Sequence, residues 1–127
     1  MMDTILVVED ERLLSTVLRR MLERRSYRVL LASDGAEALT VYRNNRSYIS
    51  AVVLDLGLPK LGGREVYLRL KDLDPNVRVL ILSGYTSPEE LSEMAPVGAL
   101  EFLQKPIMPD DLLAKLDTLL HRPPSVP

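Results

Sequence analysis

Five side chains suited to polar chemistry lie at the ends of hydrophobic segments: Glu9, Asp10, Asp55, Ser83 and Lys105. Three of them are carboxylates, which repel one another at close range unless a cation joins them. Oxygen ligands favour a hard divalent ion, Mg²⁺ above all, and the sequence has no cysteine and one histidine. A lysine and a hydroxyl group beside a carboxylate could neutralise a phosphoryl group. These residue types therefore point to phosphoryl chemistry assisted by Mg²⁺.

Asp55 follows the continuous apolar run at residues 51–54, and Gly57 and Pro59 come soon after it. An apolar run bounded by turn signals is typical of a strand buried on both faces of a parallel sheet. In open α/β sheets, ligands bind at the carboxyl ends of such strands. An isolated aspartate there would most simply cap a turn. Here other strands also end in reactive groups, so we interpret Asp55 as part of a site.

Hydrophobic patterns predict five strands that alternate with five helices. The strands are expected at residues 5–8, 28–32, 51–55, 77–82 and 100–104. Four of the helices are expected to bury an apolar stripe each. In chain order, the stripes are Leu14, Val17, Leu18, Met21 and Leu22; Ala38, Leu39 and Tyr42; Val66, Leu70 and Leu73; and Leu112, Leu116, Leu119 and Leu120. A short fifth helix is expected to begin at Ser87 and to end before Pro96. Alternation of this kind predicts an α/β fold, a parallel sheet with helices on both faces. All the strand ends would then meet at one edge.

Length and composition describe one globular domain of 127 residues, 46% of them hydrophobic and 27% charged. We expect the domain at residues 1–122 and a proline-rich tail or linker at residues 123–127. The absence of cysteine, of a signal-peptide pattern and of a long apolar run fits a cytoplasmic protein that does not enter a membrane. A net charge of −2 without a strongly basic block argues against direct nucleic-acid binding. His121, near a predicted helix end, is interpreted as a surface residue.

Four sequence blocks resemble the signature blocks of response regulator receiver domains: ILVVEDE at residues 5–11, VVLDLGLP at 52–59, LSGY at 82–85 and FLQKP at 102–106. They occur in the family's order with compatible gaps, and the resemblance covers about residues 4–121. It implies a flavodoxin-like, doubly wound α/β fold with strand order 2-1-3-4-5. It also implies a role in two-component signal transduction, either alone or as the receiver of a hybrid histidine kinase.

The resemblance implies a role for each residue of the site. Asp55 would be the phosphoacceptor and would receive a phosphoryl group from a histidine kinase or phosphotransfer protein. Asp10 would bind Mg²⁺ directly, Glu9 directly or through water, and the backbone carbonyl of Gly57 would be a further ligand. Lys105 would pair with a phosphoryl oxygen, and the bond from Lys105 to Pro106 is often cis in this family.

The same resemblance implies a conformational switch formed by Ser83 and Phe102. Ser83 would bind a phosphoryl oxygen and draw its loop inward, and the Phe102 ring would rotate into the space released. A downstream effector and a phosphorylation-dependent dimer would follow from this change. Tyr85 and Gly57 occupy positions that influence water access in the family, and Pro96 shortens a helix that receivers use for signalling.

Two other functions are less favoured by the residues. A phosphatase similar to haloacid dehalogenases would need a second aspartate two residues after Asp55, where the chain has Gly57. A pseudo-receiver would act as a binding module and would usually lack the acceptor, the lysine or the acidic pair, all of which are present. A dinucleotide-binding domain is also disfavoured, because no G-x-G-x-x-G motif follows the first predicted strand.

Overall fold

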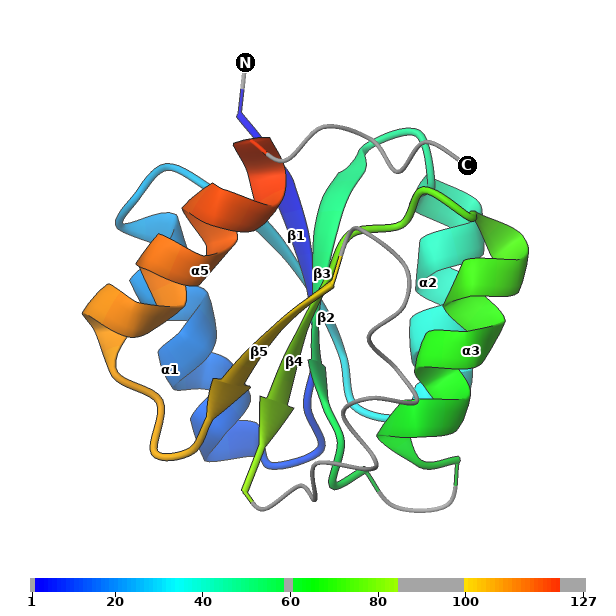
Figure 1. The fold of residues 1–127 in the computed structure, drawn as a ribbon, viewed down its shortest axis with the longest axis horizontal. Helices are drawn as coiled ribbons and strands as arrows, with labels where there is room; N and C mark the ends of the chain where they lie inside the picture. Colours follow the sequence, from blue (N-terminus) through cyan, green and yellow to red (C-terminus); the bar gives the residue numbers. More distant parts are fainter. Residues whose placement is uncertain (1, 59–60, 85–99, 122–127) are drawn as a thin grey trace.

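A parallel sheet of five strands in the order β2-β1-β3-β4-β5 forms the centre of the computed structural model, which describes residues 2–58, 61–84 and 100–121. The strands are β1 (Thr4–Val8), β2 (Arg28–Ala32), β3 (Ile49–Asp55), β4 (Val79–Ser83) and β5 (Leu100–Gln104). Because every pair of neighbouring strands is parallel, their carboxyl ends lie at the same edge, the lower one in Figure 1. The predicted flavodoxin-like α/β fold and its strand order are confirmed.

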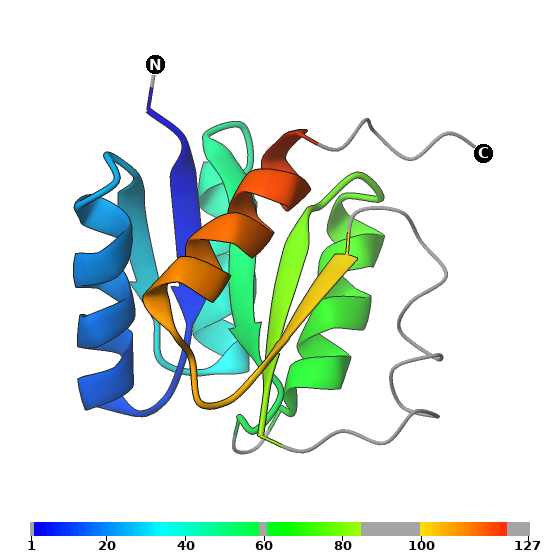
Figure 2. The ribbon, with the colours of Figure 1, turned by 60° about the vertical axis from the view of Figure 1, so that its left-hand side comes forward.

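Two pairs of helices cover the sheet, one pair on each face, as Figures 1 and 2 show. The helices α1 (Arg12–Glu23) and α5 (Pro109–His121) cover one face, and α2 (Gly35–Asn45) and α3 (Gly63–Leu73) cover the other. The fifth helix, expected from Ser87, lies outside the described residues, as does the expected tail at 123–127. None of the helices in the described ranges has the length and apolar character needed to cross a membrane.

The sheet separates two hydrophobic clusters because successive side chains of a strand point to opposite faces. Leu6, Val52 and Ile81 belong to the cluster under α2 and α3. The next side chains along β1 and β3, Val7 and Val53, belong to the cluster under α1 and α5. The inner strands are therefore buried on both faces, as the continuous apolar runs predicted.

Some details of the predicted pattern are wrong, among them the start of β3, which was expected at residue 51 and lies at Ile49. Val17 was assigned to the buried stripe of α1, but its side chain is 38% exposed, because α1 turns Ser15, Leu18 and Leu22 toward the core instead. The fourth strand was expected from residue 77 but begins at Val79. Val77 is buried in the preceding turn, where its N–H donates to the carbonyl of Asp74 at 3.0 Å.

Gly63, the first residue of α3, lets this helix begin against the end of β3. A Cβ atom at this position would lie 2.5 Å from both the carbonyl oxygen of Asp55 and the Cα of Leu56. These contacts are with backbone, which cannot move aside as a flexible side chain could. Glycine is therefore needed here, and the close approach fixes the backbone that carries Asp55.

Candidate functional site

Asp55 is the last residue of β3, and the residue is only 3% exposed. Its Oδ1 accepts a hydrogen bond of 2.9 Å from the backbone N–H of Gly57. Its Oδ2 accepts one of 3.1 Å from Nζ of Lys105. A buried carboxylate needs partners of this kind, because burial removes the water that would otherwise stabilise its charge.

The acidic pair follows β1 at the same edge of the sheet, and its two members have different surroundings. Glu9 is 3% exposed, whereas Asp10 is exposed. The backbone N–H of Glu11 donates to Oε2 of Glu9 at 3.1 Å. The other oxygen, Oε1, is buried and has no hydrogen-bond donor in the part of the chain that the structure describes. A buried carboxylate oxygen of this kind is suited to a cation.

Glu9, Asp10 and Asp55 each offer a carboxylate oxygen, and these three oxygens lie within 4.8 Å of one another. Burial raises the pKa of Glu9 from 4.5 to about 7, and the negative charge of Asp55 contributes in the same direction. The hydrogen bond from Glu11 and the charge of Lys105 oppose this increase in the pKa. The three carboxylates therefore carry more negative charge than Lys105 can neutralise, and their oxygen ligands fit Mg²⁺.

Lys105 reaches the acidic cluster from the end of β5. Its Nζ lies 3.1 Å from Oδ2 of Asp55 and 4.0 Å from Oε1 of Glu9. Its backbone N–H donates to the carbonyl of Ser83 at 2.8 Å, which joins the ends of β5 and β4. The peptide bond from Lys105 to Pro106 is cis. Lys105 thus lies between Asp55 and the end of the neighbouring strand.

Ser83 and Phe102, the residues of the expected switch, belong to the paired strands β4 and β5. Ser83 is buried at the end of β4, one residue beyond Leu82, which is the register partner of Asp55. Phe102 is paired with Ile81 and is partly buried against the cluster under α2 and α3. The structure therefore brings Ser83 to the acidic edge and places Phe102 against the core. Tyr85 lies outside the described residues.

Two backbone donors of the site could not be recognised from residue types. The N–H of Gly57 binds Asp55, whereas the carbonyl of Gly57 was expected to act as a ligand, and the N–H of Glu11 binds Glu9. Each donor lies two residues after the carboxylate that it binds. The signal available in the sequence was the turn-forming Gly57, since an aspartate often bonds to the N–H two residues further on.

The family model of the response regulator receiver domain matches residues 5–117 of the chain. The chain belongs to this family. This receiver is 41% identical over 118 residues to the response regulator MprA of Mycobacterium sp. (strain KMS), a match that covers 93% of the chain and 50% of that relative. It therefore spans about half the length of the curated relatives it matches.

Solved structures of other receivers share the fold. The receiver domain protein from Clostridium thermocellum is 29% identical, with a TM-score of 0.88 and 94% of both chains covered. A response regulator protein from Burkholderia pseudomallei, solved with a phosphorylated aspartic acid and a calcium ion, is 32% identical, with a TM-score of 0.80. That match covers 93% of this receiver and 68% of the other chain.

Proposed function

We propose that this receiver accepts a phosphoryl group on Asp55 from the phosphohistidine of a histidine kinase or phosphotransfer protein. The observation that carries the proposal is the setting of Asp55: a buried carboxylate bound to Lys105 at 3.1 Å, with carboxylate oxygens of Glu9 and Asp10 within 4.8 Å. The phosphorylated aspartic acid in the related Burkholderia protein supports the same chemistry. The receiver is a signalling domain of a two-component system and not an enzyme that turns over a substrate.

In the proposed reaction, a carboxylate oxygen of Asp55 attacks the phosphorus in line with the leaving imidazole. One phosphorus–oxygen bond forms as the phosphorus–nitrogen bond to the donor histidine breaks; the electron pair of the broken bond stays on the ring, and the proton on the other ring nitrogen makes the imidazole a neutral leaving group. Nζ of Lys105, which binds Asp55 in the free receiver, is close enough to transfer its hydrogen bond to an incoming phosphoryl oxygen. The N–H of Gly57 holds the attacking carboxylate in place.

Mg²⁺ would be held by Glu9, Asp10, Asp55 and the carbonyl of Gly57. When bound, the ion supplies positive charge for phosphoryl oxygens that approach three carboxylates. We propose that Asp10 contributes more to binding than Glu9, because Asp10 is expected to coordinate directly and Glu9 through water. Calorimetric titration of Mg²⁺ into Asp10→Asn and Glu9→Gln would test this ranking, and a larger loss of affinity from the Glu9 change would reverse it.

We further propose that Ser83 binds a phosphoryl oxygen and that the loop after it moves toward Asp55. Phe102 has no hydroxyl group to keep it in water, and burying an aromatic ring is favourable by about 1.5–3 kcal/mol. Its ring should therefore populate an inward position before phosphorylation. A dimer or a downstream effector would recognise the resulting surface, in a cytoplasmic pathway in which this segment does not itself bind nucleic acid.

The two alternatives receive less support. The acceptor, the lysine and the acidic pair of a phosphorylatable receiver are all present and lie together, unlike the usual pseudo-receiver, which lacks at least one of them. A phosphatase similar to haloacid dehalogenases would require an acid at the position of Gly57. A glycine cannot donate a proton from a side chain, so this reaction is disfavoured.

Intact-protein mass spectrometry after incubation with acetyl phosphate tests the proposal. We expect one phosphoryl adduct with Mg²⁺, none after the metal is removed with EDTA, and none in Asp55→Asn. Asp34→Asn, which changes a carboxylate at the start of α2 instead, serves as the matched control and should keep the adduct. An unchanged adduct in Asp55→Asn would contradict the assignment of the acceptor.

A further inference from the structure

The strand β2 is the outermost strand on one side of the sheet, and part of its backbone faces away from β1. In the order β2-β1-β3-β4-β5, β1 is the one described strand beside it, and Figure 2 shows α1 next to it. The N–H of Arg28 donates toward β1 over 2.9 Å, and the carbonyl of Ala32 accepts from that side over 3.0 Å. Because such bonds fall on alternate residues of a parallel strand, Leu30 also bonds to β1, whereas Val29 and Leu31 turn their N–H and C=O groups outward.

The outer edge of β2 lacks the features that keep edge strands from pairing with other chains. Residues 29–32 include no charged residue and no proline. Their register with β1 runs without a bulge. The side chains of Val29, Leu30 and Leu31 are partly exposed. A flat apolar edge with outward backbone groups is a template for a further strand, unless charge, proline or a bulge blocks it.

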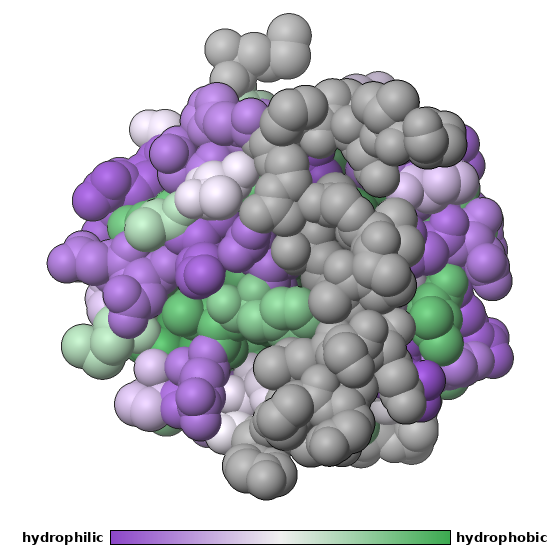
Figure 3. Space-filling model, in the orientation of Figure 1, coloured by the Kyte–Doolittle hydropathy of each residue, from purple (hydrophilic) through white to green (hydrophobic). Residues whose placement is uncertain are grey.

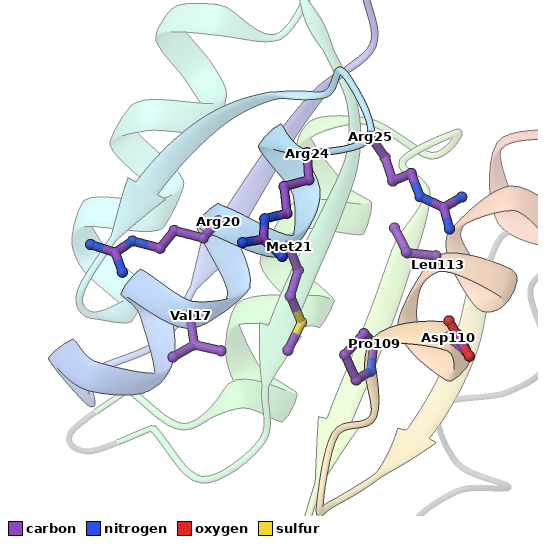
Figure 4. Close-up of a pocket in the computed structure, with 8 residues that line it drawn as sticks. All are labelled: Val17, Arg20, Met21, Arg24, Arg25, Pro109, Asp110 and Leu113. Atoms are coloured by element: carbon purple, nitrogen blue, oxygen red, sulfur yellow. The ribbon is translucent and has the colours of Figure 1, made fainter.

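Hollows beside the two ends of β2 leave open space along this edge. The lining of one, of about 370 Å³, includes Arg28 and the exposed Tyr48, and the lining of the other, of about 510 Å³, includes Leu31, Ala32 and Ser33. Neither shares a lining residue with the hollow between α1 and α5 that Figure 4 shows. Figure 3 views the molecule from the side of β5, where an apolar band lies between polar side chains. Since β2 and β5 end the sheet on opposite sides, the outer edge of β2 is a separate surface.

A second copy of the chain supplies a strand with matching outward groups. In an antiparallel pair, two residues that lie opposite each other can exchange both of their backbone hydrogen bonds. With Leu30 of both copies on a two-fold axis, Val29 of one copy lies opposite Leu31 of the other, and the reverse pair follows by symmetry. The outward N–H and C=O groups of both copies would then all be bonded.

Charges at the two ends of β2 favour this antiparallel register. Arg28 is exposed at the start of the strand. Beyond its end, the exposed Glu37 accepts a hydrogen bond of 2.8 Å from the N–H of Ser33. The antiparallel register sets Arg28 of one copy opposite Ala32 of the other, next to this carboxylate, whereas a parallel register would bring the two arginines together. The remaining charged residues that line the hollow there are two of each sign: Arg12, Arg19, Glu9 and Asp10.

We propose that two copies of this receiver pair through the outer edge of β2, with the two strands antiparallel, so that their sheets become one. Pairing of this kind does not depend on the proposed function, because the outward groups of β2 do not belong to the acidic cluster. It also differs from a dimer formed on phosphorylation through Phe102, since Phe102 belongs to β5, the outermost strand on the other side of the sheet. The pairing should therefore be as strong in Asp55→Asn as in the unmodified receiver.

Sedimentation equilibrium from micromolar to millimolar concentration tests the pairing with two variants at one position. Leu31→Pro removes an outward N–H and leaves the bonds to β1, as proline can in an edge strand. Leu31→Ala, the matched control, shortens the side chain but keeps this N–H. We expect the unmodified receiver to form dimers, and Leu31→Pro to pair at least about tenfold more weakly than Leu31→Ala. Circular dichroism shows whether each variant is folded.

An exchange of charges tests the same register without changing the backbone. Arg28→Glu should weaken the pairing severalfold, because Glu37 of the second copy would then face a carboxylate. Adding Glu37→Arg should restore it, since the two charges are then exchanged. Arg69→Glu, at an exposed position of α3, changes the net charge equally and should leave the pairing unchanged.

Amide hydrogen exchange identifies the edge through which the copies pair. As the protein concentration rises, the amides of Val29 and Leu31 should exchange more slowly, while that of Leu30, already bonded to β1, should change little. A receiver that stays monomeric at millimolar concentration would overturn the proposal. A dimer in which the amides of Val29 and Leu31 exchange as in the monomer, or protection of these amides by a different protein alone, would overturn it as well. Labelling of Asp55 by acetyl phosphate tests the proposed function separately from any of these results.

Discussion

Buried polar groups differ in their hydrogen bonding between two regions of the molecule. One region is the layer formed by α2 and α3, and the other is the carboxyl edge of the sheet. In the helical layer, the hydroxyl of Tyr42 donates to Oδ2 of Asp74 at 2.9 Å, and Tyr42 belongs to the hydrophobic cluster under α2 and α3. At the edge, Glu9 and Asp55 are buried close together, and Oε1 of Glu9 has no donor among the described residues. The layer satisfies the buried hydroxyl of Tyr42, whereas the edge leaves Oε1 of Glu9 without a hydrogen bond from the described residues.

The pKa values express the same difference. Burial and the bond to Asp74 raise the pKa of Tyr42, so the hydroxyl stays neutral at any ordinary pH and its bond is kept. Burial also raises the pKa of Glu9, to about 7, so at neutral pH the folded protein opposes the charge that a metal ligand must carry. A group retained at the expense of stability is expected at a functional site.

The largest expected effect is the loss of an apolar side chain from the helical layer. Leu70 of α3 is fully buried, so Leu70→Ala should lower the free energy of unfolding by about 2–5 kcal/mol. Leu68→Ala, in the same helix but exposed, should change it by less than about 0.5 kcal/mol. Urea denaturation of both variants measures the two values, and a similar loss in each would show that the layer is not the stable part of the fold.

The next effect has the opposite sign and lies at the edge. Because the pKa of Glu9 is higher in the folded protein than its ordinary 4.5, the folded state binds this proton more tightly than the unfolded state does. Stability is therefore lost as the pH rises from about 4.5 to about 7 and stays low above that. Glu9→Gln, which cannot ionise, should be more stable than the unmodified protein at pH 8, by about 1–3 kcal/mol in EDTA.

Thermal unfolding at pH 5 and pH 8, with and without Mg²⁺, measures this effect. The advantage of Glu9→Gln should be small at pH 5, where Glu9 is protonated in the folded state. It should also shrink at pH 8 when Mg²⁺ is added, because the ion stabilises the ionised carboxylate of the unmodified protein. An advantage that is the same at both pH values would mean that the charge of Glu9 is not its cause.

The smallest expected effect is the loss of the buried hydrogen bond of Tyr42. Tyr42→Phe removes the donor to Asp74 and should lower the free energy of unfolding by about 1 kcal/mol. Tyr48→Phe, at an exposed position, is the matched control and should have no measurable effect. If Tyr42→Phe were as stable as the unmodified protein in urea, the bond between Tyr42 and Asp74 would contribute nothing measurable to stability.

The sequence was most informative where a single physical pattern acts. The run of apolar residues before Asp55 predicted a strand buried on both faces, and β3 has this environment. The parallel alternation predicted that the strand ends would meet, and Glu9, Asp10 and Asp55 do lie together. Neither inference depends on the side chains of other elements.

The pattern failed where the result depends on another element. Val17 fits a helical stripe as well as Leu18 does, and only the position of the sheet decides which of them is buried. Asp74 directly follows α3, but the hydroxyl that donates to it belongs to Tyr42, a residue far away in the chain. The lack of a donor for Oε1 of Glu9 likewise depends on all its neighbours in space.

The location of the phosphoryl group tests the account most directly. After phosphorylation with acetyl phosphate and Mg²⁺, borohydride reduces an aspartyl phosphate to homoserine, which peptide mass spectrometry can assign to a position. We predict homoserine at position 55 alone, with none after treatment in EDTA. Homoserine at position 10, or a phosphoryl group on Ser83 that resists borohydride, would contradict the claim that Asp55, at the buried edge of the sheet, accepts the phosphoryl group.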